Sequence, residues 1–403
     1  MSLSSHGDPA GTPPADAAGA PPRWPEARPA QAVGPSTGRL VRWADTRAAG
    51  AFVLCVAALL YVGNFLGGLY GRETILLLGL LALVPLGICL AGLWWVDRWD
   101  PEPKSAVLLA VVWGAGVSVA GTLVVGQYVF EPIIAAADIA EPGVFGAVVQ
   151  APVVEELAKG LGVLLIFLVR RSHFDGPVDG IVYGGAVGAG FAFTENILYF
   201  SSAYAEGGDA VAQLFVMRGL FSPFAHVLFT AWTGFALGLA ASRGVRGAWP
   251  PYFVMGLAPA IAGHFLWNGG LALFFQDFWT FYFALQVPLF VCAVVAVWLL
   301  RRAERKLTER RLGDYRAAGW FTEREVAMLS TAAGRRAAAA WARGYGAGGL
   351  MRDFTGTAVR LAATRHRIVR GHGADGAHDE ERRLLDRALR QRQQLLAQVG
   401  APR

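Results

Sequence analysis

The stretch that decides the fold spans residues 144–169 and reads VFGAVVQAPVVEELAKGLGVLLIFLV. It is long enough to cross a bilayer as a helix, which needs about 20 mostly apolar residues. It nevertheless carries Glu155, Glu156 and Lys159 near its centre. A charged side chain at bilayer depth costs about 2.5–3.5 kcal/mol even on the lower, insertion-based scales. Such groups therefore face other protein groups or water, and they usually mark function.

The composition indicates that this stretch belongs to a membrane protein. The chain has 403 residues, of which 54% are hydrophobic and 16% charged. A soluble domain is far less apolar, so we expect an all-α fold: a polytopic helical membrane protein with about eight transmembrane helices and a helical cytoplasmic tail. Cys55, Cys89 and Cys292 all lie in apolar runs, which argues against a disulfide framework or a thiolate metal site.

The chain divides into three predicted regions. Residues 1–45 are rich in Pro, Ala and Gly and predict a disordered cytoplasmic leader. Residues 46–300 form the transmembrane core, with eight spans placed near 49–69, 75–96, 105–129, 144–169, 179–202, 212–241, 250–271 and 279–300. Residues 301–403 form a basic tail, which holds 22 Lys and Arg residues against 11 Asp and Glu.

The charges of the connecting loops predict the topology. Alternate loops carry the basic residues Arg98, Lys104, Arg170, Arg171, Arg243 and Arg246. The intervening loops hold one basic residue, Arg72, and are otherwise acidic. Because Lys and Arg mark the cytoplasmic side, we expect an even number of spans and both termini in the cytoplasm of a bacterial-type cell membrane.

The tail shows three helical patterns. Thr322 and Glu325 form a capping box ahead of a helix expected to run to about Arg343. Regularly spaced apolar residues predict two further amphipathic helices, over about 350–368 and 384–396. A regulatory domain, a surface for anionic lipid and a plain helical appendage all agree with this pattern.

Other spans carry polar residues at similar depth, namely Glu195, Asn196, His226, His264 and Asn268. Small residues share their helix faces; one such stripe is Gly180, Gly184 and Gly188. Residues four apart lie on one face, and small residues there let another helix approach closely. We therefore expect the polar side chains to form a shared site between helices. Lys159 could neutralise a glutamate, and Arg218 could simply snorkel toward the outer surface.

The residues alone leave the chemistry open. A partly desolvated carboxylate can accept a proton from water, while a His and an Asn on one face can donate to an oxyanion. The same side chains could ligate a divalent cation such as zinc. They could also relay protons in an ion-coupled transporter, although the two halves show no inverted repeat. A noncatalytic scaffold is a third class, in which the glutamates would be dispensable.

Five motifs resemble, in order, those of the PrsW family of intramembrane proteases. They are residues 97–103 (DRWDPEP), 154–159 (VEELAK), 191–196 (FAFTEN), 222–226 (SPFAH) and 264–268 (HFLWN). The resemblance covers about residues 75–270 and implies an endopeptidase acting on a membrane-protein substrate, expected to be single-pass. The best-known role in the family is cleavage of a transmembrane anti-sigma factor. The expected partners are this substrate and the lipid bilayer, without nucleic acid.

The PrsW family is similar to the wider group of membrane proteases that includes the CAAX prenyl endopeptidases. That similarity implies a general base, a group that orients water, and an oxyanion hole. These roles fall in turn on Glu155 or Glu156, on His226, and on His264 with Asn268. Glu195 stands where the prenyl proteases carry a His, so it is either a supporting residue or a metal ligand. Zinc stays open as a cofactor.

Overall fold

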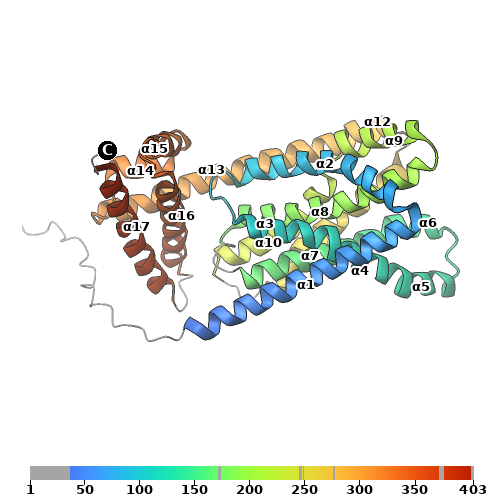
Figure 1. The fold of residues 1–403 in the computed structure, drawn as a ribbon, viewed down its shortest axis with the longest axis horizontal. Helices are drawn as coiled ribbons and strands as arrows, with labels where there is room; N and C mark the ends of the chain where they lie inside the picture. The colour runs from blue at the N-terminus through green and yellow to red at the C-terminus, as the bar shows by residue number, and fades with distance from the viewer. Residues whose placement is uncertain are drawn as a thin grey trace, which may run out of the picture.

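The computed structural model describes residues 37–170, 174–244, 247, 249–275, 277–371 and 376–400. Across these ranges the chain is helical and contains no strand. Helical rods form a long bundle, and a smaller helical tail covers one end of it (Figure 1). Short π-helical turns, labelled η, interrupt several of the rods.

In chain order the rods of the bundle consist of α1 (Thr37–Tyr70); α2 (Arg72–Asp97); α3 (Lys104–Val112), η1 (Trp113–Ser118), α4 (Val119–Val125), η2 (Gly126–Phe130) and α5 (Glu131–Ala136); α6 (Pro142–Phe145), η3 (Gly146–Gln150) and α7 (Ala151–Val169); α8 (Pro177–Tyr204); α9 (Gly208–Leu214), η4 (Phe215–Phe221) and α10 (Ala225–Ser242); α11 (Trp249–Gly269) and η6 (Gly270–Phe274); and α12 (Phe278–Phe281), η7 (Tyr282–Gln286) and α13 (Val287–Ala317). The tail adds α14 (Glu323–Ser330), α15 (Ala332–Gly344), α16 (Gly348–Val369) and α17 (Ala377–Gly400).

The rods coincide with the predicted spans. Six of them are long and apolar enough to cross a membrane, namely those of α1, α2, α3–α5, α8, α9–α10 and α12–α13. The other two are α6–α7, which carries three charged residues, and α11 with η6. A multi-pass, all-α membrane protein is thus confirmed, whereas the count of eight crossings stays a prediction.

The centre of the bundle is the pair α8 and α10, whose backbones touch. A Cβ on Gly180 would lie 2.0 Å from the carbonyl oxygen of Gly234, and one on Gly188 would lie 2.4 Å from that of His226. Carbon and oxygen atoms that are not bonded do not approach so closely, so a larger residue would push the helices apart. The predicted stripe of small residues on α8 is confirmed, and its partner is α10.

The outer surface of the bundle is apolar, while charged side chains lie inside. Leu76 and Leu80 on α2 are 69% and 66% exposed, and Lys159 is completely buried. This arrangement suits helices surrounded by lipid, where ionisable residues face the bundle interior.

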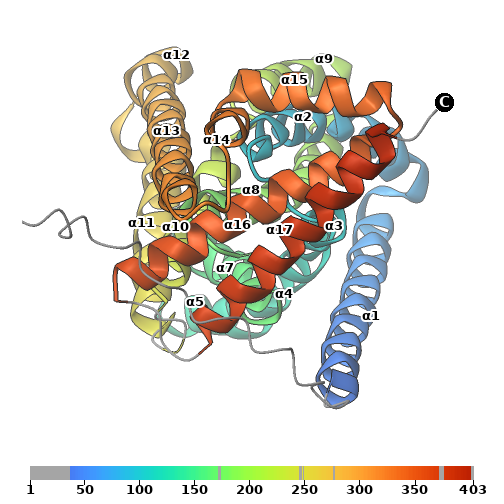
Figure 2. The same ribbon diagram turned by 90° about the vertical axis from the view of Figure 1, so that its left-hand side faces the viewer.

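The tail packs across one end of the bundle. Seen from that end, α16 and α17 lie over the ends of α7, α8 and α10 (Figure 2). Its core is separate from that of the bundle and buries Tyr315 of α13 with Leu329, Phe354, Leu361 and Leu384.

The capping box predicted in the tail is present: the Thr322 hydroxyl accepts from the N–H of Glu325, and the Glu325 carboxylate accepts from the N–H of Thr322. The helix that it starts is shorter than predicted, because α14 and α15 are separated by Thr331. The backbone of Thr331 is extended, and its hydroxyl accepts from the N–H of Gly334 to cap α15. The two further predicted helices are confirmed as α16 and α17.

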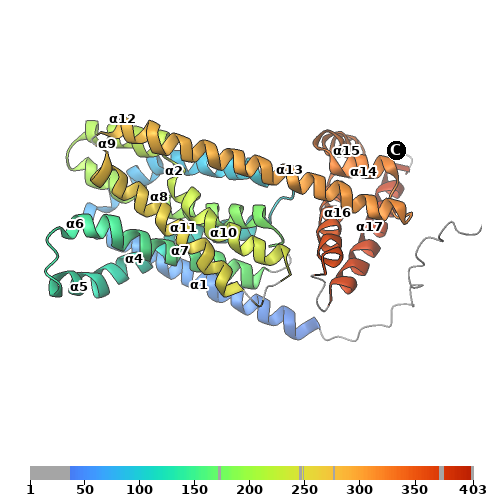
Figure 3. The same cartoon turned by 180° about the vertical axis from the view of Figure 1, so that it is seen from behind.

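The helix α13 joins the two parts without a break, so the predicted boundary between residues 300 and 301 falls inside it (Figure 3). At the start of the chain, α1 begins at Thr37, and residues 1–36 of the predicted leader lie outside the described residues. The start of α1 and the end of α17 lie at the same end of the bundle (Figure 1).

The tail meets the bundle at the loop of residues 97–103. The guanidinium of Arg335 lies 3.4 Å from the ring centroid of Trp99 and donates to the Trp99 carbonyl oxygen. Six carboxylates gather at this junction, and we call them the loop cluster: Asp97, Asp100, Glu102, Asp175, Asp179 and Glu304. Four of them line a small cavity of about 110 Å³.

Candidate active site

Four rods bring six ionisable side chains together at the centre of the bundle. We call them the polar cluster: Glu155, Glu156 and Lys159 on α7, Glu195 on α8, His226 on α10 and His264 on α11. At 1.5 Å per residue, they lie roughly 15–27 Å from the tail-side ends of their helices. The sequence predicts a shared site from these residues, and the structure places all six in mutual contact.

Lys159 is the hub of the polar cluster. Its Nζ donates to Glu155 Oε2 (3.1 Å), Glu156 Oε1 (2.8 Å) and His226 Nδ1 (2.9 Å). The ammonium also lies 3.8 Å from the ring centroid of Phe191. These contacts replace the hydration that this fully buried cation would have in water. Lys159 therefore contacts both adjacent glutamates rather than one.

The two glutamates differ in how their oxygens are occupied. Oε1 of Glu156 accepts from Lys159 and lies 3.1 Å from Nδ1 of His264, while Oε2 accepts from the Thr230 hydroxyl (2.9 Å). Glu155 accepts from Lys159 at Oε2, and its Oε1 has no hydrogen bond within the described part of the chain. Glu156 is 0% exposed and Glu155 is 6% exposed. Of these two glutamates, Glu155 is therefore the one that keeps an oxygen available for a ligand.

The tautomer of His226 follows from its partners. An ammonium group has no lone pair, so Nδ1 accepts from Lys159 and the ring proton lies on Nε2. Nε2 donates to Oε2 of Glu195 (2.8 Å). Glu195 therefore orients the imidazole, and Nδ1 faces the interior of the polar cluster.

The cluster opens to its surroundings on one side, beside Glu195. The side chain of Glu195 is 16% exposed and that of Arg218 is 29% exposed, whereas the deeper members are buried. Arg218 Nη2 donates to Glu195 Oε2 (2.5 Å), and its Nε donates to Asn196 Oδ1 (3.3 Å). The guanidinium lies 4.0 Å from the ring centroid of Tyr199. Arg218 thus belongs to the site, which the sequence analysis missed; a single arginine inside an apolar span is the signal that could have pointed to it.

Asn268 lies one turn beyond His264 on α11, apart from the glutamates. Its Nδ2 donates to the carbonyl oxygen of Ala147 in η3 (2.8 Å). The residue ties α11 to the rod that carries the glutamates. Its role in an oxyanion hole stays a prediction.

Three members of the polar cluster form a donor set for a metal ion. Glu155, His226 and His264 each offer one ligand atom, and these atoms lie within 4.8 Å of one another. Zinc takes one carboxylate and two imidazoles in several peptidases. Each imidazole also contacts a second carboxylate, Glu195 or Glu156, as metal-binding histidines usually do. The three residue types therefore fit a divalent cation, which would have to displace the Lys159 ammonium from Nδ1 of His226.

Comparisons with known proteins converge on one family. The profile described as "PrsW family intramembrane metalloprotease" matches residues 102–297. The Protease PrsW of Bacillus subtilis is 34% identical over 155 residues, which are 38% of this chain and 65% of that relative. Residues 102–297 are thus similar to the PrsW family.

Further PrsW relatives agree. The Protease PrsW of Clostridioides difficile is 28% identical over 192 residues, which are 46% of this chain and 75% of the relative. That of Geobacillus kaustophilus is 33% identical over 144 residues, 36% of this chain and 58% of the relative. The matched region thus spans between 58% and 75% of these relatives. No solved structure matches the chain.

The PrsW match includes every member of the polar cluster. It begins inside the loop of residues 97–103 and ends before the tail, so α1 and the tail domain lie outside it.

Proposed function

We propose that this protein is an intramembrane endopeptidase that hydrolyses peptide bonds of membrane proteins. The observation that carries the proposal is the buried polar cluster, in which Glu155 keeps one oxygen without a hydrogen bond beside two imidazoles. Similarity to a family described as proteases supports the same reaction.

We assign the general base to Glu155. Its carboxylate accepts a proton from water, whose oxygen then forms a bond to the carbonyl carbon of the substrate. The carbonyl oxygen becomes an oxyanion, and the carbon–nitrogen bond breaks as Glu155 returns the proton to the leaving nitrogen. Glu156, with both oxygens occupied, instead positions Lys159 and His264.

The two histidines lie beside Glu155. We assign His264 to the oxyanion: as an imidazolium it donates from Nδ1 to Glu156 and from Nε2, which lies 3.9 Å from Glu155 Oε2, while Asn268 holds α11 in place. Glu195 holds His226 at Nε2, and Nδ1 of His226 can face the water once Lys159, which donates to it at 2.9 Å, has moved away.

A divalent cation such as zinc would be held by Glu155, His226 and His264. When bound, such an ion lowers the pKa of water and polarises the carbonyl group. Activity that survives exhaustive chelation would support the reaction without it.

We also propose a topology. Both termini would lie in the cytoplasm of a bacterial-type cell membrane, which basic loop residues at the tail end of the bundle, such as Arg98 and Arg170, support. On this topology α8 and α11 run outward, and Glu195 and His264 come late in each. The site then faces the outer half of the membrane. The proposed substrate is a single-pass protein cut near its outer end, in the manner of an anti-sigma factor.

The alternative of an ion-coupled transporter is not favoured, because the matching family is one of proteases. The two functions differ in a direct measurement. A transporter reconstituted in vesicles would carry protons or ions across the bilayer, and a protease would not.

The proposal is tested by comparing the membrane proteins of cells that produce wild-type protein with those of cells that produce Glu155→Gln. We expect at least one single-pass protein to be shortened only with the wild type, and the purified wild type to cut that protein in detergent. A Glu155→Gln variant that processes it at the normal rate would refute the assignment.

A further inference from the structure

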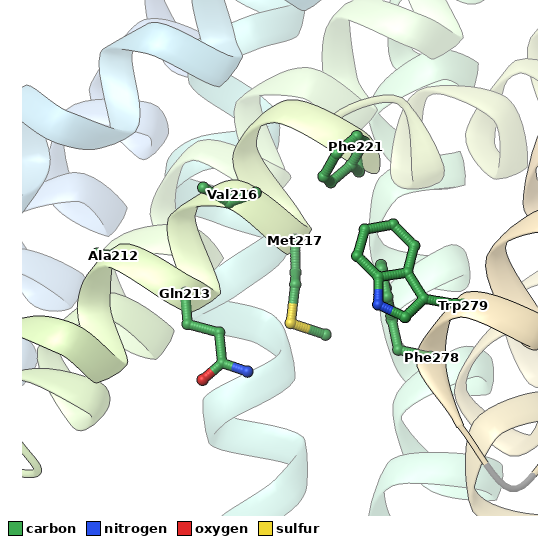
Figure 4. A pocket seen from close by; sticks show the side chains of 7 residues that line it. All are labelled: Ala212, Gln213, Val216, Met217, Phe221, Phe278 and Trp279. Atoms are coloured by element: carbon green, nitrogen blue, oxygen red, sulfur yellow. The ribbon is translucent and has the colours of Figure 1, made fainter.

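A groove of about 400 Å³ lies between η4 and α12, at the end of the bundle away from the tail (Figure 1). Gln213, Val216, Met217 and Phe221 line one wall, and Phe278 and Trp279 line the other. Met217 and Trp279 point into the opening from opposite walls (Figure 4). Gln213 alone among these six side chains is polar, and Trp279 is 53% exposed. The groove therefore presents an apolar surface to the membrane.

The groove and the polar cluster share one segment of chain. Val216 and Met217 line the groove, and Arg218, the next residue of η4, donates to Glu195. One face of η4 thus forms the groove wall, while another forms the most exposed edge of the polar cluster.

The inner end of the groove is close in sequence to the polar cluster. The ring centroid of Phe221 lies 5.5 Å from that of Trp279, and the Ser222 hydroxyl donates to Gln286 Oε1 (2.7 Å). These contacts join the end of η4 to the α12–η7 rod. A short turn follows, and α10 then begins at Ala225 with His226 in its first turn.

We infer that this groove takes the apolar side chains at the outer end of a substrate's transmembrane helix, so that the adjoining peptide passes Arg218 into the polar cluster. The inference rests on the proposed function and adds the surface on which the substrate docks. Continuity with the exposed edge of the polar cluster favours a peptide over a lipid chain. So does Gln213, because a helix that unwinds in a membrane needs partners for its freed backbone groups.

Photo-crosslinking tests the occupant directly. A benzophenone amino acid replaces Met217 in protein that also carries Glu155→Gln, and Leu220 is the matched control. Leu220 lies on the same η4, is 46% exposed and does not line the groove. The probe is a biotinylated peptide with one Leu/Ala segment of about 20 residues and a Gly/Ser flank, in phosphatidylcholine vesicles. We expect about tenfold more peptide adduct from position 217 than from 220. Equal yields, or adducts with lipid alone, would overturn the inference.

Filling the groove provides a second measurement. With the membrane protein that distinguishes wild type from Glu155→Gln as substrate, Met217→Trp should raise KM about tenfold and change kcat less than about twofold, because it removes binding shared by ground and transition states. Leu220→Trp should change neither. Unchanged KM in an active Met217→Trp enzyme would refute the groove and leave the protease intact. Peptide adducts at position 217, found together with a wild-type protein that cuts no membrane protein, would refute the protease function and leave the groove as a peptide-binding site.

Discussion

The polar cluster within the membrane and the loop cluster at the tail junction both gather carboxylates, but they compensate them differently. In the polar cluster, every carboxylate contacts a cation: Glu155 and Glu156 contact Lys159, and Glu195 contacts Arg218. Direct pairing offsets the cost of holding charge in a region of low dielectric constant. In this cluster the carboxylates are therefore compensated by ion pairs.

The loop cluster relies more on neutral donors and on protonation. Burial raises the pKa of Glu102 to about 9, although the Tyr183 hydroxyl donates to it (2.5 Å). Burial also raises the pKa of Asp100 to about 7, with Asp175 adding to the shift and Arg335 opposing it. These two carboxyl groups hold protons near neutral pH. The ion-paired carboxylates of the polar cluster are thus suited to catalysis. The carboxyl groups of the loop cluster are suited to a response to pH.

The largest expected difference between the clusters is in activity. Glu155→Gln should lower turnover by about 10²–10⁴-fold, the usual effect of losing a general base. Glu102→Gln should leave turnover of the folded protein close to that of the wild type, because Gln keeps the shape of a neutral carboxyl group. Both are measured as rates per folded molecule in detergent. Equal losses in the two variants would remove the functional distinction between the clusters.

Removing the ammonium group of Lys159 tests whether the buried carboxylates need this cation for stability. Lys159→Met should destabilise the protein by about 3–5 kcal/mol, because two buried carboxylates lose their partner. Adding Glu156→Gln should recover part of this loss, which denaturant unfolding in detergent would measure. A Lys159→Met variant as stable as the wild type would show that the carboxylates do not need the ammonium.

Close helix packing can be tested at the polar cluster, because the backbone of His226 lies against Gly188. Gly188→Ala should cost about 1–3 kcal/mol through overpacking, and it should lower activity by displacing the backbone of His226. Gly87→Ala on α2 is the control, because a Cβ there would meet nothing within 4 Å. Thermal unfolding and activity of the two variants would be compared, and matching values would argue against backbone contact between α8 and α10.

Asn268 marks the edge of the polar cluster. Because its amide donates to Ala147, Asn268→Ala should cost about 1 kcal/mol of stability, the value of one hydrogen bond. Activity per folded molecule should fall only slightly. A loss of about 10²–10³-fold would instead show that Asn268 donates to the oxyanion, as the family resemblance implies.

The last expected difference is the pH response of the loop cluster. Because the pKa of Glu102 rises from 4.5 to about 9 on folding, folding takes up a proton between these values. The resulting stabilisation is complete below pH 4.5 and is lost as the pH rises toward 9. Glu102→Gln should lose less stability than the wild type over this range. Hydrogen exchange of the tail, measured at several pH values in the wild type and in Glu102→Gln, would check this prediction. Identical pH profiles of the two proteins would contradict it.

Sequence patterns predicted most of the fold, because lipid imposes simple rules. Long apolar runs gave the rods, and the glycine stripe on α8 indicated close contact with another helix. The break at Thr331 was missed, because a threonine within an Ala-rich pattern is compatible with a helix and caps one only when its backbone is extended. The docking of Arg335 on Trp99 was also missed, since residues so far apart in sequence carry no local signal.

For the site, polar residues in apolar spans indicated which helices would meet. They did not indicate which atoms would form hydrogen bonds. The polar cluster was predicted from its ionisable residues. The difference between Glu155 and Glu156 required the positions of Thr230 and His264, which bond to Glu156. Arg218 looked like an interfacial residue, because its contact with Glu195 depends on how two separate rods pack.

The continuous α13 has a mechanical consequence. It comprises 31 residues, about 46 Å at 1.5 Å per residue, and only 6% of the apolar window of its rod is buried in the protein. One end of this rod carries the tail, and the other follows η7 and α12, which forms a wall of the groove. A helix so little packed along its side acts as a lever, and a tilt of about 5° would displace its far end by about 4 Å. Force applied to the tail would therefore reach the opposite side of the membrane along α13, while the contact of Arg335 with Trp99 holds the tail to the near end of the bundle.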